Sequence, residues 1–145
     1  MKVKIVENEN ISDTHITIEC VKKDETVNQI IQYLKSLEKT LTCKKEREIY
    51  QIGIQDIYYI ESVDEKTFVY VKDCFYECPY KLYELESQFQ SNKFMRINKS
   101  CLLNLKYLES VKVLIYGKYE AKLKNGEKLV ISRKYMPAFK KEFGI

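Results

Sequence analysis

Two turns divide residues 107–131 into three short apolar segments. Gly117–Lys118 separates the first two segments, and Asn125–Gly126 separates the last two. Asn-Gly between apolar segments is the strongest short-range signal for a β-hairpin, because both central residues of the favoured turn take positive φ. Residues 107–116, 119–124 and 127–131 therefore predict a three-stranded antiparallel meander, which any fold of this chain must contain.

The residues around the meander divide into further short elements. A helix is expected over 81–90, with Leu82, Leu85 and Phe89 on one face. A second helix should begin near Tyr135, because Pro137 is tolerated only in a first turn. Residues 99–104 fit either a loop or a helical turn. The predicted strands are 49–52, 57–62, 67–72, 75–78 and 94–97, of which the third and fourth form a hairpin around 72–74.

The N-terminal part has a different pattern. Residues 3–7 and 15–21 are typical of two short strands joined by the polar segment 8–14. Asp24 is placed to cap a helix over 26–38, whose apolar residues recur with helical spacing. A length of 145 residues suits one domain with a short extension. We therefore expect a strand–strand–helix extension over 1–45 and a mostly β (α+β) domain over 46–145.

Several protein classes are excluded by simple counts. The longest apolar runs are four residues, which excludes a membrane-spanning helix and a signal peptide, so a cytoplasmic location is the default. Five cysteines, an odd number, indicate reduced thiols. Cys74 and Cys78 have no further ligands at metal-site spacing, so no metal is expected. Without a Gly-rich phosphate loop, a G-x-S-x-G motif or a nucleophile–base pair, neither a cofactor nor an enzyme is expected.

The charges are unevenly distributed along the chain. Residues 1–45 carry a net charge of +1, residues 46–90 carry −6, and residues 91–145 carry +9. A strongly basic third favours a surface that binds a polyanion, with a solvated lysine-rich surface as the alternative. The arginines are only Arg47, Arg96 and Arg133 against 22 lysines. They stand out because a guanidinium can bind a phosphate or a guanine edge with two parallel hydrogen bonds.

Three segments, taken in order, resemble one known family. They are Asp56–Ser62 (DIYYIES), Phe94–Ser100 (FMRINKS) followed by Asn104, and Asn125–Tyr135 (NGEKLVISRKY). With the predicted helix between the first two, they are similar to the LytTR DNA-binding domain, the output domain of LytR/AlgR-type bacterial transcription regulators. The resemblance covers about residues 46–145. It implies a compact stack of small antiparallel sheets with few helices, which grips DNA with loops that enter successive major grooves.

The resemblance also implies where the DNA contacts lie. Base-reading side chains are expected near Lys66 and Thr67, at Asn98 and Lys99, and at Arg133. Asn98 stands where the family commonly has histidine, and Lys99 where it often has arginine, which puts the target sequence in doubt more than the activity. Structural roles are the alternatives: an ordinary strand position for Thr67, an ion pair for Arg96, a loop cap for Asn104, and a core position for Tyr135. The full set of predicted DNA-binding residues is Lys66, Thr67, Arg96, Asn98, Lys99, Ser100, Arg133, Lys134 and Tyr135.

These features predict a stand-alone, sequence-specific regulator that binds double-stranded DNA. The alternative is a β-rich interaction module whose basic face docks an acidic protein or an anionic membrane. The roughly 45 residues before the domain are too few for a phosphoacceptor receiver domain, so phosphorylation in cis is not expected. The extension is expected to pack on the domain, to support a homodimer on repeated sites, or to contact a regulatory protein. By family analogy that protein is a small membrane protein.

Overall fold

The computed structural model describes residues 1–145, apart from the side chain of Ser91. It contains three α-helices, ten strands and five short 3-10 turns. The helices are α1 (Glu25–Ser36), α2 (Leu82–Gln88) and α3 (Met136–Phe143). The strands are β1 (Thr40–Lys45), β2 (Glu48–Gly53), β3 (Tyr59–Val63), β4 (Lys66–Tyr70), β5 (Phe75–Cys78), β6 (Phe94–Asn98), β7 (Cys101–Asn104), β8 (Leu108–Val113), β9 (Tyr119–Leu123) and β10 (Lys128–Ile131). The 3-10 turns are η1 (Ile54–Asp56), η2 (Gln90–Asn92), η3 (Leu105–Tyr107), η4 (Ile115–Gly117) and η5 (Arg133–Tyr135).

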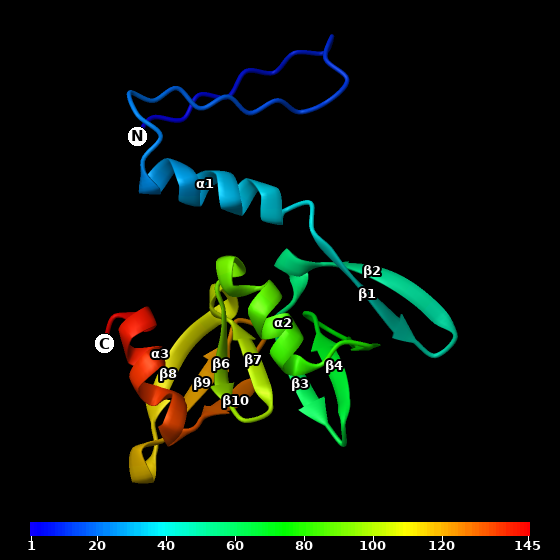
Figure 1. Cartoon of the computed structure of the whole chain (residues 1–145), viewed down its shortest axis with the longest axis vertical. Coiled ribbons are helices and arrows are strands. Elements are labelled where there is room, and N and C mark those ends of the chain that lie inside the picture. The colour runs from blue at the N-terminus through cyan, green and yellow to red at the C-terminus, as the bar shows by residue number, and fades with distance from the viewer.

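The strands form two antiparallel sheets. The larger sheet has seven strands in the order β2-β1-β5-β4-β3-β7-β6, and the smaller has three in the order β10-β9-β8. The smaller sheet is the predicted meander, and the β4–β5 hairpin is also present as predicted. The fold is therefore mostly β with few helices, as the sequence indicated (Figure 1).

Two hydrophobic cores lie on opposite faces of the larger sheet. The first contains sheet residues such as Ile60 and Leu102 packed with Leu82, Leu85 and Phe89 of the α2 region. The second packs the other face against the smaller sheet and α3. Its members are Tyr58, Tyr59, Ile97, Cys101, Leu103, Ala121, Leu123, Ile131, Met136 and Phe139. Since side chains alternate along a strand, β3 and β7 contribute neighbouring residues to the two different cores.

Residues 101–104, which fitted a loop or helical turn in the sequence, form strand β7. All four residues are buried because both faces of this part of the sheet are covered. A strand buried on both faces loses the alternation of apolar and polar residues that identifies a half-exposed strand. Asn104 ends it as a cap: its Oδ1 accepts from the Lys106 N–H at 3.1 Å, and its Nδ2 donates to the Ile57 carbonyl at 2.8 Å.

The prediction of two N-terminal strands, at residues 3–7 and 15–21, is wrong. Residues 1–24, all within the described part of the chain, contain no strand, and they run away from both sheets beyond α1 (Figure 1). Val3 and Ile5 remain more than four-fifths exposed. An alternating segment becomes a strand only when a neighbouring strand accepts its backbone hydrogen bonds. Within residues 1–23 the backbone hydrogen bond found is that of a turn, from the Ile11 N–H to the Asn8 carbonyl.

The rest of the predicted extension differs in a second way. Helix α1 begins as expected, with Asp24 Oδ1 accepting from the Val27 N–H at 3.0 Å. Residues 40–45, however, form β1, which pairs with β2 and β5. Leu41 and Cys43 of this strand are buried in the first core. The larger sheet thus begins at Thr40, six residues before the predicted start of the domain at residue 46.

Candidate nucleic-acid interface

Three turns from distant parts of the sequence meet at one edge of the molecule. They are the β3–β4 turn (residues 63–66), the β6–β7 turn (98–101) and the segment after β10 (132–135), which together we call the turn edge. The Ser62 N–H donates to the Ser100 carbonyl at 2.8 Å, and the Ser132 N–H donates to the Ile97 carbonyl at 2.9 Å. These bonds hold the turns in a row along the lower edge in Figure 1, at the opposite end from α1.

The β3–β4 turn exposes one of its two predicted contact residues and buries the other. Asp64 and Glu65 have φ values of 51° and 65°, the geometry of a tight two-residue hairpin. Alternation along β4 then directs Lys66 to solvent and Thr67 inward, where Thr67 is 3% exposed. The prediction that Thr67 reads a base is corrected, because its side chain is buried and does not reach the surface of the turn edge. The two carboxylates before Lys66 also make this end of the turn edge the less basic one.

In the β6–β7 turn, Asn98 and Ser100 hydrogen-bond within the protein, whereas the Lys99 side chain is exposed to solvent. Asn98 Nδ2 donates to the Val130 carbonyl at 2.9 Å, while its Oδ1 accepts from the Ser100 N–H at 2.9 Å and from the Ser100 hydroxyl at 3.2 Å. Asn98 therefore ties the turn to β10 and shapes its own loop. Lys99, at the tip, is exposed. Of the predicted residues in this turn, Lys99 is the one best placed to reach a ligand.

Arg96 occupies a structural position behind the turn. Its side chain is 16% exposed and forms an ion pair with Glu86 of α2, with Nη2 and Oε1 3.2 Å apart. Its Nη1 donates to the Lys99 carbonyl at 2.7 Å. The ion-pair alternative raised from the sequence is thus present, and the guanidinium holds the β6–β7 turn against α2.

The segment after β10 presents two exposed cations. Arg133 and Lys134 lie in η5, and both side chains are exposed. The Lys134 ammonium lies 5.5 Å from the centroid of the half-buried Tyr135 ring, within reach of a cation–π contact. Since η5 runs directly from β10 into α3, the backbone at Arg133 is fixed by a strand on one side and a helix on the other.

A fourth turn beside Arg133 was not foreseen as part of the site. The β8–β9 connection contains η4, in which Tyr116 is 77% exposed and Gly117 has a φ of 73°. A Cβ built on Gly117 would lie 3.4 Å from Arg133 Cδ, so the arginine side chain runs along this glycine. The sequence indicated a turn at Gly117–Lys118, but nothing in it showed that Arg133 would be the neighbour.

Two carboxylates, Glu61 and Glu127, lie near the buried Tyr59. The Tyr59 hydroxyl donates to Glu127 Oε2 at 3.0 Å, and burial together with this bond raises the pKa of Tyr59. Burial, followed by the nearby charge of Glu127, raises the pKa of the Glu61 carboxyl. These groups line the contact between the two sheets, so they affect stability more directly than ligand binding.

The remaining chemistry of the described residues is sparse. No group of three or more His, Cys, Asp or Glu side chains among them gathers at metal-binding distance. Burial raises the pKa of the Cys43 thiol to about 12 and that of Cys101 further, so neither is activated as a nucleophile. None of the described helices is both long and apolar enough to cross a bilayer. What the turn edge offers is a row of cations on turns joined by backbone hydrogen bonds, which suits a polyanion.

Comparison with known proteins identifies the family of this arrangement. The sequence matches the LytTr DNA-binding domain over residues 47–144. The chain belongs to the LytTR family. The resemblance found in the three sequence segments is thereby confirmed, and with it the expected DNA-binding regulatory class.

Relatives of the whole chain occur in Staphylococcus aureus. An uncharacterized HTH-type transcriptional regulator of strain NCTC 8325 / PS 47 is 27% identical over 147 residues, covering 100% of this chain and 99% of the relative. Its counterpart in strain MRSA252 is 26% identical with the same coverage. The alignment thus includes the N-terminal segment and α1 as well as the LytTR domain.

A solved structure supports the fold. A LytTr DNA-binding domain from Bacillus cereus superposes with a TM-score of 0.71 at 22% identity, covering 74% of this chain and 99% of that one. Within the described residues, α2 and α3 are separated by five strands and form no helix-turn-helix pair. This LytTR protein therefore presents turns, rather than a recognition helix, at its basic edge.

Proposed function

We propose that this LytTR protein is a sequence-specific transcription regulator that reads the major grooves of double-stranded DNA with the turn edge. The observation that carries the proposal is the convergence of three turns, each bearing an exposed cation. Backbone hydrogen bonds with donor–acceptor distances of 2.8 and 2.9 Å join them. Rigid placement favours specific contacts because little side-chain and loop entropy is lost on binding.

Different residues of the turn edge have different proposed roles. Lys66, Lys99 and Arg133 are the base readers, since lysine and arginine both recognise the O6 and N7 acceptors of guanine. Ser100, Lys134 and Tyr135 are phosphate contacts, which fix the register without reading sequence. Asn98 and Arg96 position the β6–β7 turn through the bonds they already make. The Asn98 Nδ2 group donates one hydrogen to the Val130 carbonyl of β10, so one amide hydrogen remains that could be donated to a base.

The biological setting is part of the same proposal. A regulator that binds duplex DNA works beside the chromosome, so we place it in the cytoplasm. A homodimer on repeated sites would place two turn edges on one face of the duplex. A regulatory partner protein, by family analogy a membrane protein, is the other proposed contact, and α1 with residues 1–24 is the surface available for it.

The test combines selection of a duplex with salt titration. Bound duplexes are selected from a random pool, and the affinity of the protein for the most enriched duplex is measured at several salt concentrations. Lys134→Ala, at a proposed phosphate contact, should weaken binding severalfold and lower the log–log salt slope by about 0.9. Lys4→Ala, an exposed lysine in the N-terminal segment, is the charge-matched control and should change neither. No selected sequence, or equal effects of the two variants, would contradict the proposal.

One observation favours the second candidate, an interaction module for an acidic protein. Val113, Ile115 and Tyr116 are 70%, 75% and 77% exposed beside the turn edge, and exposed apolar groups are typical of protein contacts. The same titration separates the two functions. A module of this kind would show weak duplex binding with no preference for the selected sequence over a scrambled one.

A further inference from the structure

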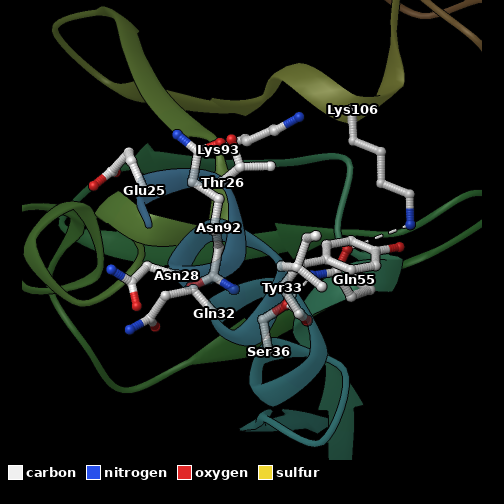
Figure 2. A pocket seen from close by; sticks show the side chains of 12 residues that line it. Glu25, Thr26, Asn28, Gln32, Tyr33, Ser36, Gln55, Asn92, Lys93 and Lys106 are labelled. Atoms are coloured by element: carbon white, nitrogen blue, oxygen red, sulfur yellow. Dashed lines mark hydrogen bonds between the residues drawn. The ribbon is translucent and has the colours of Figure 1, made fainter. Parts of the chain in front are cut away.

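A large cavity lies between α1 and the LytTR domain, far from the turn edge. Its volume is about 1020 Å³, at the upper end of the range for small-molecule sites. One wall is α1, which contributes Ile30 and Tyr33 as well as polar side chains, and the other is formed around η1, η2 and η3 of the domain. Helix α1 is held there by few contacts, including the bond from Gln55 Nε2 to Ser36 Oγ at 2.7 Å. Figure 2 shows the polar side chains that reach into this space.

Asn92 lines the cavity with unused hydrogen-bonding capacity. Its side chain is 7% exposed, and among the described residues neither its Nδ2 nor its Oδ1 has a hydrogen-bond partner. Burying an amide without partners costs free energy, because its hydrogen bonds to water are lost. In Figure 2 this amide extends from η2 toward Asn28 and Gln32 of α1. These two lie four residues apart, one helical turn, and so share one face of α1.

The groups around the amides differ in chemistry and occupy separate parts of the cavity. Tyr33 is 50% exposed and offers an aromatic face. Lys93 and Lys106 supply ammonium groups from two sides (Figure 2). Glu25 also lines the cavity and can accept hydrogen bonds from hydroxyl groups. Lys106 is anchored by its bond to Gln55 Oε1 at 3.4 Å.

A single class of small molecule matches all of these groups. Asparagine and glutamine amides form paired hydrogen bonds with the edges of nucleobases, which carry adjacent donors and acceptors. Aromatic side chains stack on the faces of bases. Lysine ammonium groups bind phosphate oxygens, and a carboxylate accepts from ribose hydroxyls. We propose that the α1 cavity is a binding site for a nucleoside monophosphate, with Asn92 recognising the base.

This site is spatially distinct from the turn edge. Asn92 and Lys93 precede β6, and Lys106 follows β7, whereas Lys99 lies at the other end of the same hairpin. A five-residue strand spans roughly 16 Å, so the two sites are separated by the length of the hairpin. Binding at one site can therefore be told from binding at the other, whether or not the turn edge binds DNA.

The test titrates the full chain with the four nucleoside monophosphates and follows its backbone amide resonances at physiological salt. Inorganic phosphate and the free nucleosides are titrated as the two halves of the ligand. We expect at least one nucleotide to shift amides of α1, of residues 92–93 and of Lys106, and to bind at least tenfold more tightly than either half. Shifts confined to 98–101 and 132–135, or no shifts at all, would overturn the proposal.

Two variants distinguish recognition from a structural role. Asn92→Leu keeps the side-chain size and removes the unpaired amide, so it should weaken nucleotide binding at least tenfold while leaving the melting temperature unchanged or higher. Gln32→Leu, on the α1 wall, should also weaken binding and does not depend on a buried change. Gln88→Leu, an exposed glutamine of α2 that does not line the cavity, is the matched control. Unchanged affinity in both cavity variants would refute the assignment.

Discussion

Polar side chains at the turn edge divide into those with internal partners and those without. Asn98 and Arg96 each make hydrogen bonds that hold the β6–β7 turn, while Lys99 and Arg133 are exposed. A side chain whose donors are already used must break a bond before it binds DNA, which reduces the net gain. The exposed pair is therefore expected to dominate sequence discrimination, and the internal pair to act through loop geometry.

The first prediction concerns Arg133. Arg133→Lys keeps the charge but loses the planar guanidinium that makes two parallel bonds to guanine. If Arg133 reads a base, the variant should lose about 1–3 kcal/mol on the selected duplex and tolerate changes at one base pair. A binding titration against the duplex and its single-base variants measures both effects. Unchanged discrimination at every position would leave Arg133 as a phosphate contact.

The second prediction concerns Glu61, whose pKa is raised by burial and by the charge of Glu127. A raised carboxyl pKa means that ionisation is less favourable in the folded protein, so stability is lost as pH rises through the folded-state pKa. Glu61→Gln removes the charge and should raise the free energy of unfolding at pH 7, by less than about 1 kcal/mol for this half-buried group. Below the ordinary carboxyl pKa, near pH 4, the difference should vanish.

Urea unfolding at the two pH values measures this effect. Glu7→Gln, in the exposed N-terminal segment, is the control and should behave like the native protein at both. A Glu61→Gln variant that is less stable at pH 7 would show that the carboxylate has a favourable partner in solution.

At the level of elements, the β8–β9 turn adjoins the edge through Gly117. Its φ of 73° is unfavourable for any residue with a Cβ, and a Cβ would contact Arg133 Cδ at 3.4 Å. Gly117→Ala should therefore cost about 1–2 kcal/mol of stability and also weaken DNA binding by moving Arg133. The variant's unfolding free energy and its affinity for the selected duplex test the two parts separately.

Gly144 provides the matched control. It has a φ of 82° at the end of α3, but a Cβ there would meet nothing within 4 Å. Gly144→Ala should show a similar backbone cost without a change in DNA affinity. If the Gly117 variant binds DNA as well as the Gly144 variant does, the contact between Gly117 and Arg133 has no part in positioning the arginine.

At the scale of the whole molecule, two truncations should behave differently. Removal of residues 1–23 deletes an exposed segment, keeps the Asp24 cap of α1 and leaves both cores complete, so the protein should keep its unfolding free energy and its DNA preference. Removal of residues 1–45 also deletes β1, with the buried Leu41 and Cys43, and should cost several kcal/mol. Chemical unfolding and selection of duplexes by the shorter truncation test this. A changed duplex preference would assign residues 1–23 to DNA recognition.

The amino-acid sequence by itself determined the features that depend on neighbouring residues. Asn125–Gly126 specified the last hairpin, Asp24 specified the start of α1, and Pro137 specified the start of α3. Three short segments in order were enough to indicate the family. Each of these signals arises from backbone conformations or caps within a few residues, where sequence spacing and spatial distance coincide.

Tertiary structure decided every feature whose partner is distant in the sequence. Arg96 forms an ion pair with Glu86, 10 residues away, and Asn98 donates to the Val130 carbonyl, 32 residues away. The Arg133 side chain lies against Gly117. Pairing of β4 in the sheet turned Thr67 inward, and the lack of a neighbouring strand left residues 1–24 without strand structure. Side-chain availability depends on these long-range contacts, because the same residue type binds a ligand when its donors are free and positions a loop when they are not.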